Sequence, residues 1–151
     1  MHNTKNDLAK EQREKVVEHL NARLADMIDL KTQAKQAHWN VKGIHFIGLH
    51  ELFDQVATAA EAHTDSIAER ITTLGGTAMG TARVVAQKSS LSEYPLEIFD
   101  GTAHVDALST AMADCGKKIR QNIGDTDELG DKDTADLFTE VSRELDKLLF
   151  V

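Results

Sequence analysis

The apolar positions of this chain recur at three- and four-residue steps, the spacing that places them along one face of an α-helix. Val17, Leu20, Leu24 and Met27 begin this pattern, which continues in three later segments. The sequence therefore predicts four long helices, over residues 8–38, 48–74, 102–123 and 131–151. A glycine follows each of the first three, as is common beyond a helix C-terminus. No such stop precedes residue 151, so we expect the natural fourth helix to be longer.

The second and third predicted helices are joined by residues 75–101, a connection too long for a tight helix hairpin. Within it, residues 91–99 are apolar enough to predict a short helix packed on the outside. Four helices with one long crossover are the plan of ferritin-like bundles. The length of 151 residues fits a single all-α domain over 1–151.

Five residues of metal-ligand type stand out along the first two helices. They are His38, His50, Asp54, Asp65 and Glu69. Imidazole and carboxylate groups suit first-row metals, and a helix presents them together at a spacing of four residues. At ~100° per residue, with His50 at zero, the four on the second helix fall between about 0° and 100°. The apolar residues of that helix fall near 200–300°, so the polar stripe faces away from the bundle's own core.

The two ligand pairs on the second helix lie too far apart to share a metal site within one chain. At ~1.5 Å per residue, Asp54 and Asp65 are separated by roughly 16 Å along the axis, whereas paired metals lie only ~3.5–4 Å apart. Two copies crossing antiparallel about a two-fold axis near residues 59 and 60 would place His50 opposite the partner's Glu69. Asp54 would then face the partner's Asp65, and His38 would join the His50 half.

An ordinary amphipathic helix also carries a polar stripe opposite its apolar face, because that face is solvated. Either pair alone would therefore be weak evidence. The combination of two pairs, their symmetric spacing and the nearby third histidine favours a metal site shared between copies.

Composition limits the partners that this chain can have. The net charge of −8 opposes binding to a polyanion unless basic residues are segregated, and Lys5 is the one basic residue in segment 1–6. No apolar run approaches the ~18–20 residues of a membrane span. The single cysteine, Cys115, cannot form an internal disulfide and fits a reducing compartment. We expect a cytoplasmic protein with no membrane partner and with weak or no DNA binding.

Two segments resemble the Dps family, the DNA-binding proteins from starved cells, a branch of the ferritin-like superfamily. They are KQAHWNVKG at 35–43 and DSIAER at 65–70. Residues 90–96 resemble the family's short crossover helix, and residues 133–136 and 142–147 resemble its last helix. The likeness covers nearly the whole chain. It also fits the lack of any Glu-x-x-His pair, which ordinary ferritins carry inside each bundle.

The resemblance implies a ferroxidase, an enzyme that oxidises Fe(II), with two-iron sites between two-fold-related subunits. His38, His50 and Asp54 would come from one subunit, and Asp65 and Glu69 from its mate. It further implies a hollow homo-dodecamer that stores ferric mineral and uses hydrogen peroxide in preference to dioxygen. Zinc is a candidate competitor for the same ligands, a point that the sequence leaves open. The alternative is a nucleoid-associated protein that compacts DNA and has secondary iron chemistry. The short N-terminal segment favours the iron function.

Several other residues carry expectations of their own. His63 falls near 220° on the second helix, which predicts a hydrogen-bonded core histidine, and Cys115 is predicted to pack in the core. Trp39, which follows His38 directly, is predicted to pack in the core, and the alternative is a place near the iron, where it would quench stray oxidising equivalents. Acidic residues gather where the fourth helix begins, where they suit the helix N-terminus or, by the resemblance, would line pores that draw in Fe(II). This acidic group is Asp125, Asp127, Glu128, Asp131, Asp133 and Asp136.

Overall fold

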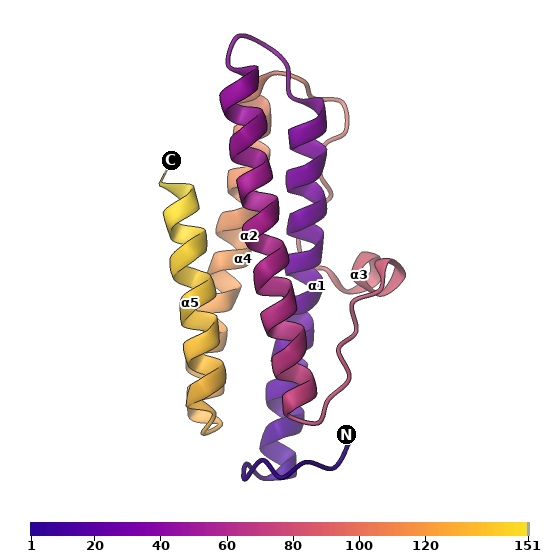
Figure 1. The fold of residues 1–151 in the computed structure, drawn as a ribbon, viewed down its shortest axis with the longest axis vertical. Coiled ribbons are helices and arrows are strands. Elements are labelled where there is room, and N and C mark those ends of the chain that lie inside the picture. The colour runs from indigo at the N-terminus through magenta and orange to yellow at the C-terminus, as the bar shows by residue number, and fades with distance from the viewer. Residues whose placement is uncertain (151) are drawn as a thin grey trace.

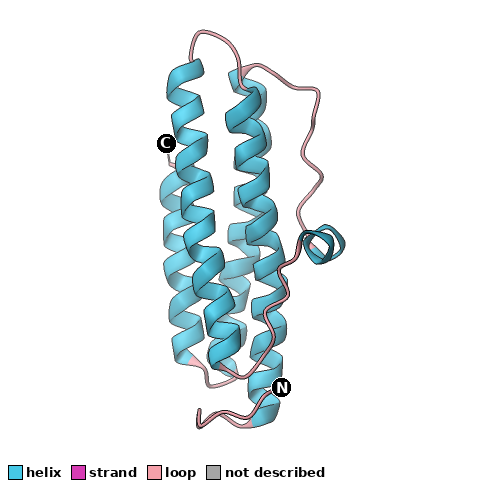
Figure 2. Cartoon of the chain, turned by 45° about the vertical axis from the view of Figure 1, so that its right-hand side comes forward, coloured by secondary structure: helices cyan, strands magenta, loops and turns pink. Residues whose placement is uncertain are grey.

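The computed structural model describes residues 1–150 and contains one elongated helical bundle (Figure 1). Its elements are α1 (Lys10–Asn40), α2 (Phe46–Thr73), α3 (Ala82–Lys88), α4 (Gly101–Glu128) and α5 (Lys132–Leu149). The four long helices lie side by side, and the crossover from α2 to α4 runs along the outside of the bundle and carries the short α3 (Figures 1 and 2). The predicted all-α bundle with a long crossover is confirmed. Among the helices of residues 1–150, none has an apolar stretch that could span a bilayer.

One hydrophobic core joins the four long helices. Each helix turns its apolar face inward, and burying a large side chain of this kind contributes ~1.5–3 kcal/mol. The fully buried members include Leu20, Leu24, Met27 and Leu30 of α1, Ile67 and Ile71 of α2, Ile119 of α4, and Phe138 and Leu145 of α5. Cys115 is also buried in this core, as its place in the helical pattern predicts.

The end of α4 differs from the expected position. The helix continues past Gly124 to Glu128, because Gly124 keeps helical geometry on an open face, where its cost is only ~1 kcal/mol relative to alanine. The chain turns instead at Gly130, whose φ of 82° favours glycine. Gly43 and Gly75 have positive φ in the same way and follow the ends of α1 and α2.

The short crossover helix is not where the sequence pattern predicts it. Residues 91–99 contain no helix, and the short helix is α3 instead. Side chains of α1 hold the start of this segment: Ser90 donates from both N and Oγ to the buried Asp26, and Gln33 Nε2 donates to the Ser92 carbonyl. Pro95 also disfavours a helical conformation at Tyr94. Leu91 and Tyr94 of this non-helical segment are buried against the bundle, whereas Leu96 and Phe99 are exposed.

A buried polar network ties the end of α2 to the start of α5. Asp131 is only 3% exposed and caps α5 by accepting a hydrogen bond from Thr134 N at 3.0 Å. Arg70 donates to Asp131 Oδ1 at 2.8 Å and to Thr134 Oγ1 at 2.9 Å. The expectation that Asp131 lines a pore is therefore wrong, because this carboxylate is already committed inside the subunit.

We predict that Asp131→Ala lowers the free energy of unfolding by about 2–4 kcal/mol, because it removes the cap and leaves Arg70 without its buried partner. Asp136→Ala, an exposed residue of the same helix, should change it by less than ~0.5 kcal/mol. Chemical denaturation followed by circular dichroism measures both variants. Equal unfolding midpoints for the two would contradict the structural role of Asp131.

Candidate metal centre

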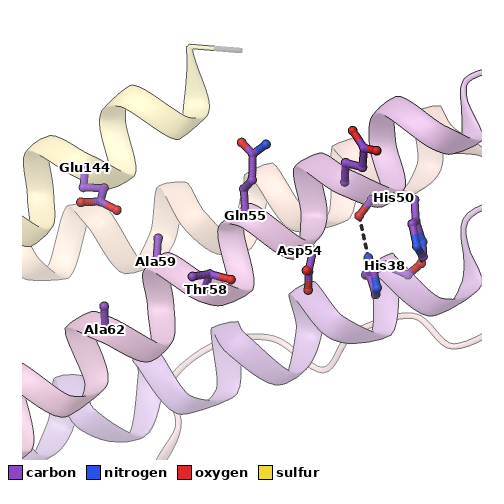
Figure 3. Close-up of a pocket in the computed structure, with 9 residues that line it drawn as sticks. His38, His50, Asp54, Gln55, Thr58, Ala59, Ala62 and Glu144 are labelled. Carbon is purple, nitrogen blue, oxygen red and sulfur yellow. Dashed lines mark hydrogen bonds between the residues drawn. The ribbon is translucent and has the colours of Figure 1, made fainter.

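The end of α1 and the start of α2 are joined by residues 41–45, which bring His38 and His50 face to face. Their rings stack, with centroids 3.7 Å apart and planes inclined by 18°. The two residues exchange hydrogen bonds: His38 Nδ1 lies 2.6 Å from the carbonyl oxygen of His50, and His50 Nδ1 lies 2.7 Å from the carbonyl oxygen of His38 (Figure 3). The ring of Phe46 stacks on His50 with a centroid separation of 4.9 Å.

These two hydrogen bonds determine the tautomer of both rings. A carbonyl oxygen can only accept, so the hydrogen of each neutral ring must sit on Nδ1. The lone pair is then on Nε2 in both residues. Metal-binding histidines are commonly held in this way, with one nitrogen donating to a backbone carbonyl and the other left for the metal. His38 and His50 are therefore prepared as ligands by backbone groups of the opposite helix.

Asp54 lies one turn beyond His50 and forms an ion pair with α1. The ammonium of Lys35 donates to Asp54 Oδ1 at 2.7 Å, and this bond is the main reason that the pKa of Asp54 is lowered. The carboxylate thus stays ionised well into acid. Nearby, the side chain of Trp39 is 66% exposed, so the expectation that it packs in the core is wrong. It lies with its ring centroid 6.0 Å from the Lys35 ammonium.

The three residues His38, His50 and Asp54 line one open groove of about 630 Å³ (Figure 3). Most of the other lining residues come from the same face of α2, and one comes from α5. They are Glu51, Gln55, Thr58, Ala59, Ala62 and Glu144. Glu51 and Glu144 are not among the residues that the sequence pattern predicts for the site. No local signal marks Glu144, because its position depends on how α5 packs against α2.

Asp65 and Glu69 are exposed on α2 and do not line this groove. Within residues 1–150, no three His, Cys, Asp or Glu side chains come close enough together to hold a metal ion. One chain thus gathers three of the five candidate residues along one groove and keeps the other two apart. The completion of the site by a second copy stays a prediction.

Two other histidines are buried away from the ligand stripe. His63 is 5% exposed, as predicted, but its Nε2 has no hydrogen-bond partner, so the expected hydrogen bond is missing at that nitrogen. His104 is 1% exposed and pairs through Nδ1 with the Tyr94 hydroxyl at 2.6 Å. Burial lowers the pKa of His104. The hydrogen bond between Tyr94 and His104 joins the crossover to α4, and neither residue lines the groove.

Comparisons with known proteins agree with the fold. A family model described as Ferritin, ferritin-like domain, matches residues 17–149. The DNA protection during starvation protein of Agrobacterium fabrum is 46% identical over 149 residues, which cover 99% of this chain and 92% of that protein. DNA protection during starvation protein 2 of Bacillus anthracis is 32% identical, over 87% of this chain and 90% of that protein.

Solved structures show the same fold. Dps of Mycobacterium smegmatis superposes with a TM-score of 0.94 at 29% identity, covering 99% of this chain and 90% of that one. Dps of Vibrio cholerae, described as a member of a superfamily of ferritin-like diiron-carboxylate proteins, has a TM-score of 0.92 at 26% identity, with coverages of 99% and 94%. The chain therefore belongs to the ferritin-like family and, within it, to the Dps (DNA protection during starvation) proteins.

Proposed function

We propose that this Dps-type iron-storage and protection protein is a ferroxidase that oxidises Fe(II) at sites shared between two subunits. The observation that supports this best is the reciprocal bonding of His38 and His50, which leaves a lone pair on Nε2 of both rings. Asp54 adds an ionised carboxylate to the same groove. Asp65 and Glu69 from a two-fold-related copy would supply the remaining carboxylates, and twelve copies would enclose a store for the ferric product.

The chemistry of these residues suits iron as a substrate. Imidazole nitrogen and carboxylate oxygen bind Fe(II) without filling its coordination positions, so an oxidant can also bind. Two Fe(II) ions held together give two electrons to one hydrogen peroxide, which becomes two hydroxide ions, and no hydroxyl radical is released. The carboxylates bind the harder Fe(III) product well. Dioxygen would be the slower oxidant, and zinc would compete for the same nitrogen ligands.

Anaerobic loading with Fe(II), followed by hydrogen peroxide, tests this proposal. We expect rapid oxidation with one peroxide consumed per two Fe(II), and light scattering from a particle near twelve times the 16.6 kDa of one chain. His50→Ala should lose the acceleration, because the groove then lacks one nitrogen ligand. Oxidation by the wild-type protein at the rate of protein-free buffer would contradict the ferroxidase function.

We predict that Lys35→Met tightens divalent-metal binding at pH 7 by roughly two- to fivefold, because the Lys35 ammonium occupies one oxygen of Asp54 and repels cations. The pKa of Asp54 should rise toward its ordinary value, but the carboxylate remains ionised at pH 7. Lys31→Met is the matched control: it removes an ion pair with Glu61, one turn along α1 and outside the groove. Calorimetric titration with Zn(II) measures both. Binding by Lys35→Met that is no tighter than binding by Lys31→Met would refute this role of Lys35.

The acidic start of α5 is a candidate entry route for iron. With Asp131 committed to the fold, Asp133 and Asp136 are the exposed carboxylates of this segment. We predict that Asp133→Asn with Asp136→Asn slows Fe(II) uptake severalfold at low salt, because a negative surface draws in cations. A double variant of the exposed Asp106 and Asp114 of α4 removes the same charge elsewhere. Stopped-flow absorbance measures the rate of Fe(II) uptake in both double variants. Equal rates in the two would rule out this route.

DNA compaction is the second candidate function, because the names of the relatives mention the protection of DNA. The charge of −8 opposes it, and Lys10 and Lys15 at the start of α1 lie 3.8 and 3.5 Å from Glu14 and Glu11. Phosphate contacts need cations that are not already neutralised. We predict that duplex DNA stays unshifted by the assembled protein in a gel at about 150 mM salt. Near-stoichiometric retention of the duplex would contradict this prediction.

A further inference from the structure

His63 of α2 carries a buried nitrogen, Nε2, that forms no hydrogen bond within residues 1–150. The side chain is 7% exposed, and its Nε2 faces Glu144 of α5, with 3.5 Å between Nε2 and Glu144 Oε2. Leaving a buried polar atom without a partner costs ~1–3 kcal/mol. Such an atom in an otherwise well-packed bundle calls for an explanation, such as an ion that the two groups share.

The separation of the two groups is suited to a metal ion. Bonds from a first-row metal to imidazole nitrogen or carboxylate oxygen measure ~2.0–2.2 Å, so two neighbouring ligands of one ion lie roughly 3.0–3.5 Å apart. The distance from His63 Nε2 to Glu144 Oε2 falls at the upper end of this range. An ordinary charged hydrogen bond between the same groups would be shorter, ~2.7–2.9 Å.

The position of Glu144 connects this pair to the groove. Glu144 lines the groove together with His38, His50 and Asp54, and its side chain is 45% exposed (Figure 3). Ala59 and Ala62, which lie between it and Asp54 on the lining of α2, have small side chains that leave the groove open. An ion held by Glu144 would therefore border the same open space as the three candidate ligands.

We propose that His63 and Glu144 form a second, weaker binding site for a divalent first-row transition metal, within one subunit and at the α5 end of the groove. Two protein ligands leave the other coordination positions to water, so the ion exchanges quickly. Such a site suits an ion in transit rather than a stored one. Fe(II) would bind there before it reaches His38, His50 and Asp54. This transit role rests on the proposed ferroxidase function, whereas the binding of a metal ion by His63 and Glu144 is independent of it.

Crystals of the assembled protein soaked in millimolar Zn(II), a probe without redox chemistry, test the site directly. Anomalous scattering at the zinc edge should show an ion bonded to His63 Nε2 and Glu144 in the wild-type protein. Glu144→Gln should lose this ion and keep the one at His38 and His50. Glu140→Gln, another exposed glutamate one turn earlier on α5, should keep both. In solution, Glu144→Gln should weaken the weaker class of Zn(II) sites at least about tenfold.

The outcomes separate the two proposals. Zinc at His38 and His50 but none between His63 and Glu144 would overturn this inference and leave the ferroxidase proposal standing. Zinc at neither place would overturn both. An ion that persists at His63 in Glu144→Gln would also overturn the inference, because Glu144 would then not be a ligand.

Discussion

The mutual hydrogen bonding of His38 and His50 is the contact on which the candidate metal centre depends. Each ring donates to the backbone of the other helix, so a single contact joins the end of α1 to the start of α2 and orients two imidazoles. Because a carbonyl oxygen accepts and never donates, both neutral rings carry their hydrogen on Nδ1. The orientation of both imidazoles is thus tied to the backbone of the bundle.

The rest of the chain supports this contact and leaves one side of it open. The shared core aligns α1 with α2, and the buried pair of Arg70 and Asp131 anchors α5 beside the far end of α2. The packing of α5 then brings Glu144 to the edge of the groove. In the described part of the chain, residues 1–150, the exposed Asp65 and Glu69 of α2 belong to no cluster of three metal-binding side chains. Under the proposed function, a second copy of the chain would complete this set of ligands.

The apolar periodicity was enough to predict the four long helices and the bundle, because amphipathic helices of this length have few ways to bury their faces. The spacing of His50, Asp54 and Asp65 likewise predicted that one chain could not hold the whole site. Periodicity failed in the crossover, where Asp26 of α1 accepts a hydrogen bond from the backbone N–H of Ser90 and the residues that follow are not helical. It also could not reveal Glu144 or the roles of Asp131 and Lys35, because those depend on contacts between helices far apart in sequence.

Mixing two inactive variants tests the shared site most directly. One chain would carry His50→Ala and Asp54→Asn, and the other Asp65→Asn and Glu69→Gln, so neither alone can complete a site. If two-fold-related subunits share each site, a one-to-one co-assembly recovers about a quarter of the wild-type ferroxidase activity, since one site in four combines two intact halves. A co-assembly that forms intact particles but stays as inactive as either variant alone would contradict the account.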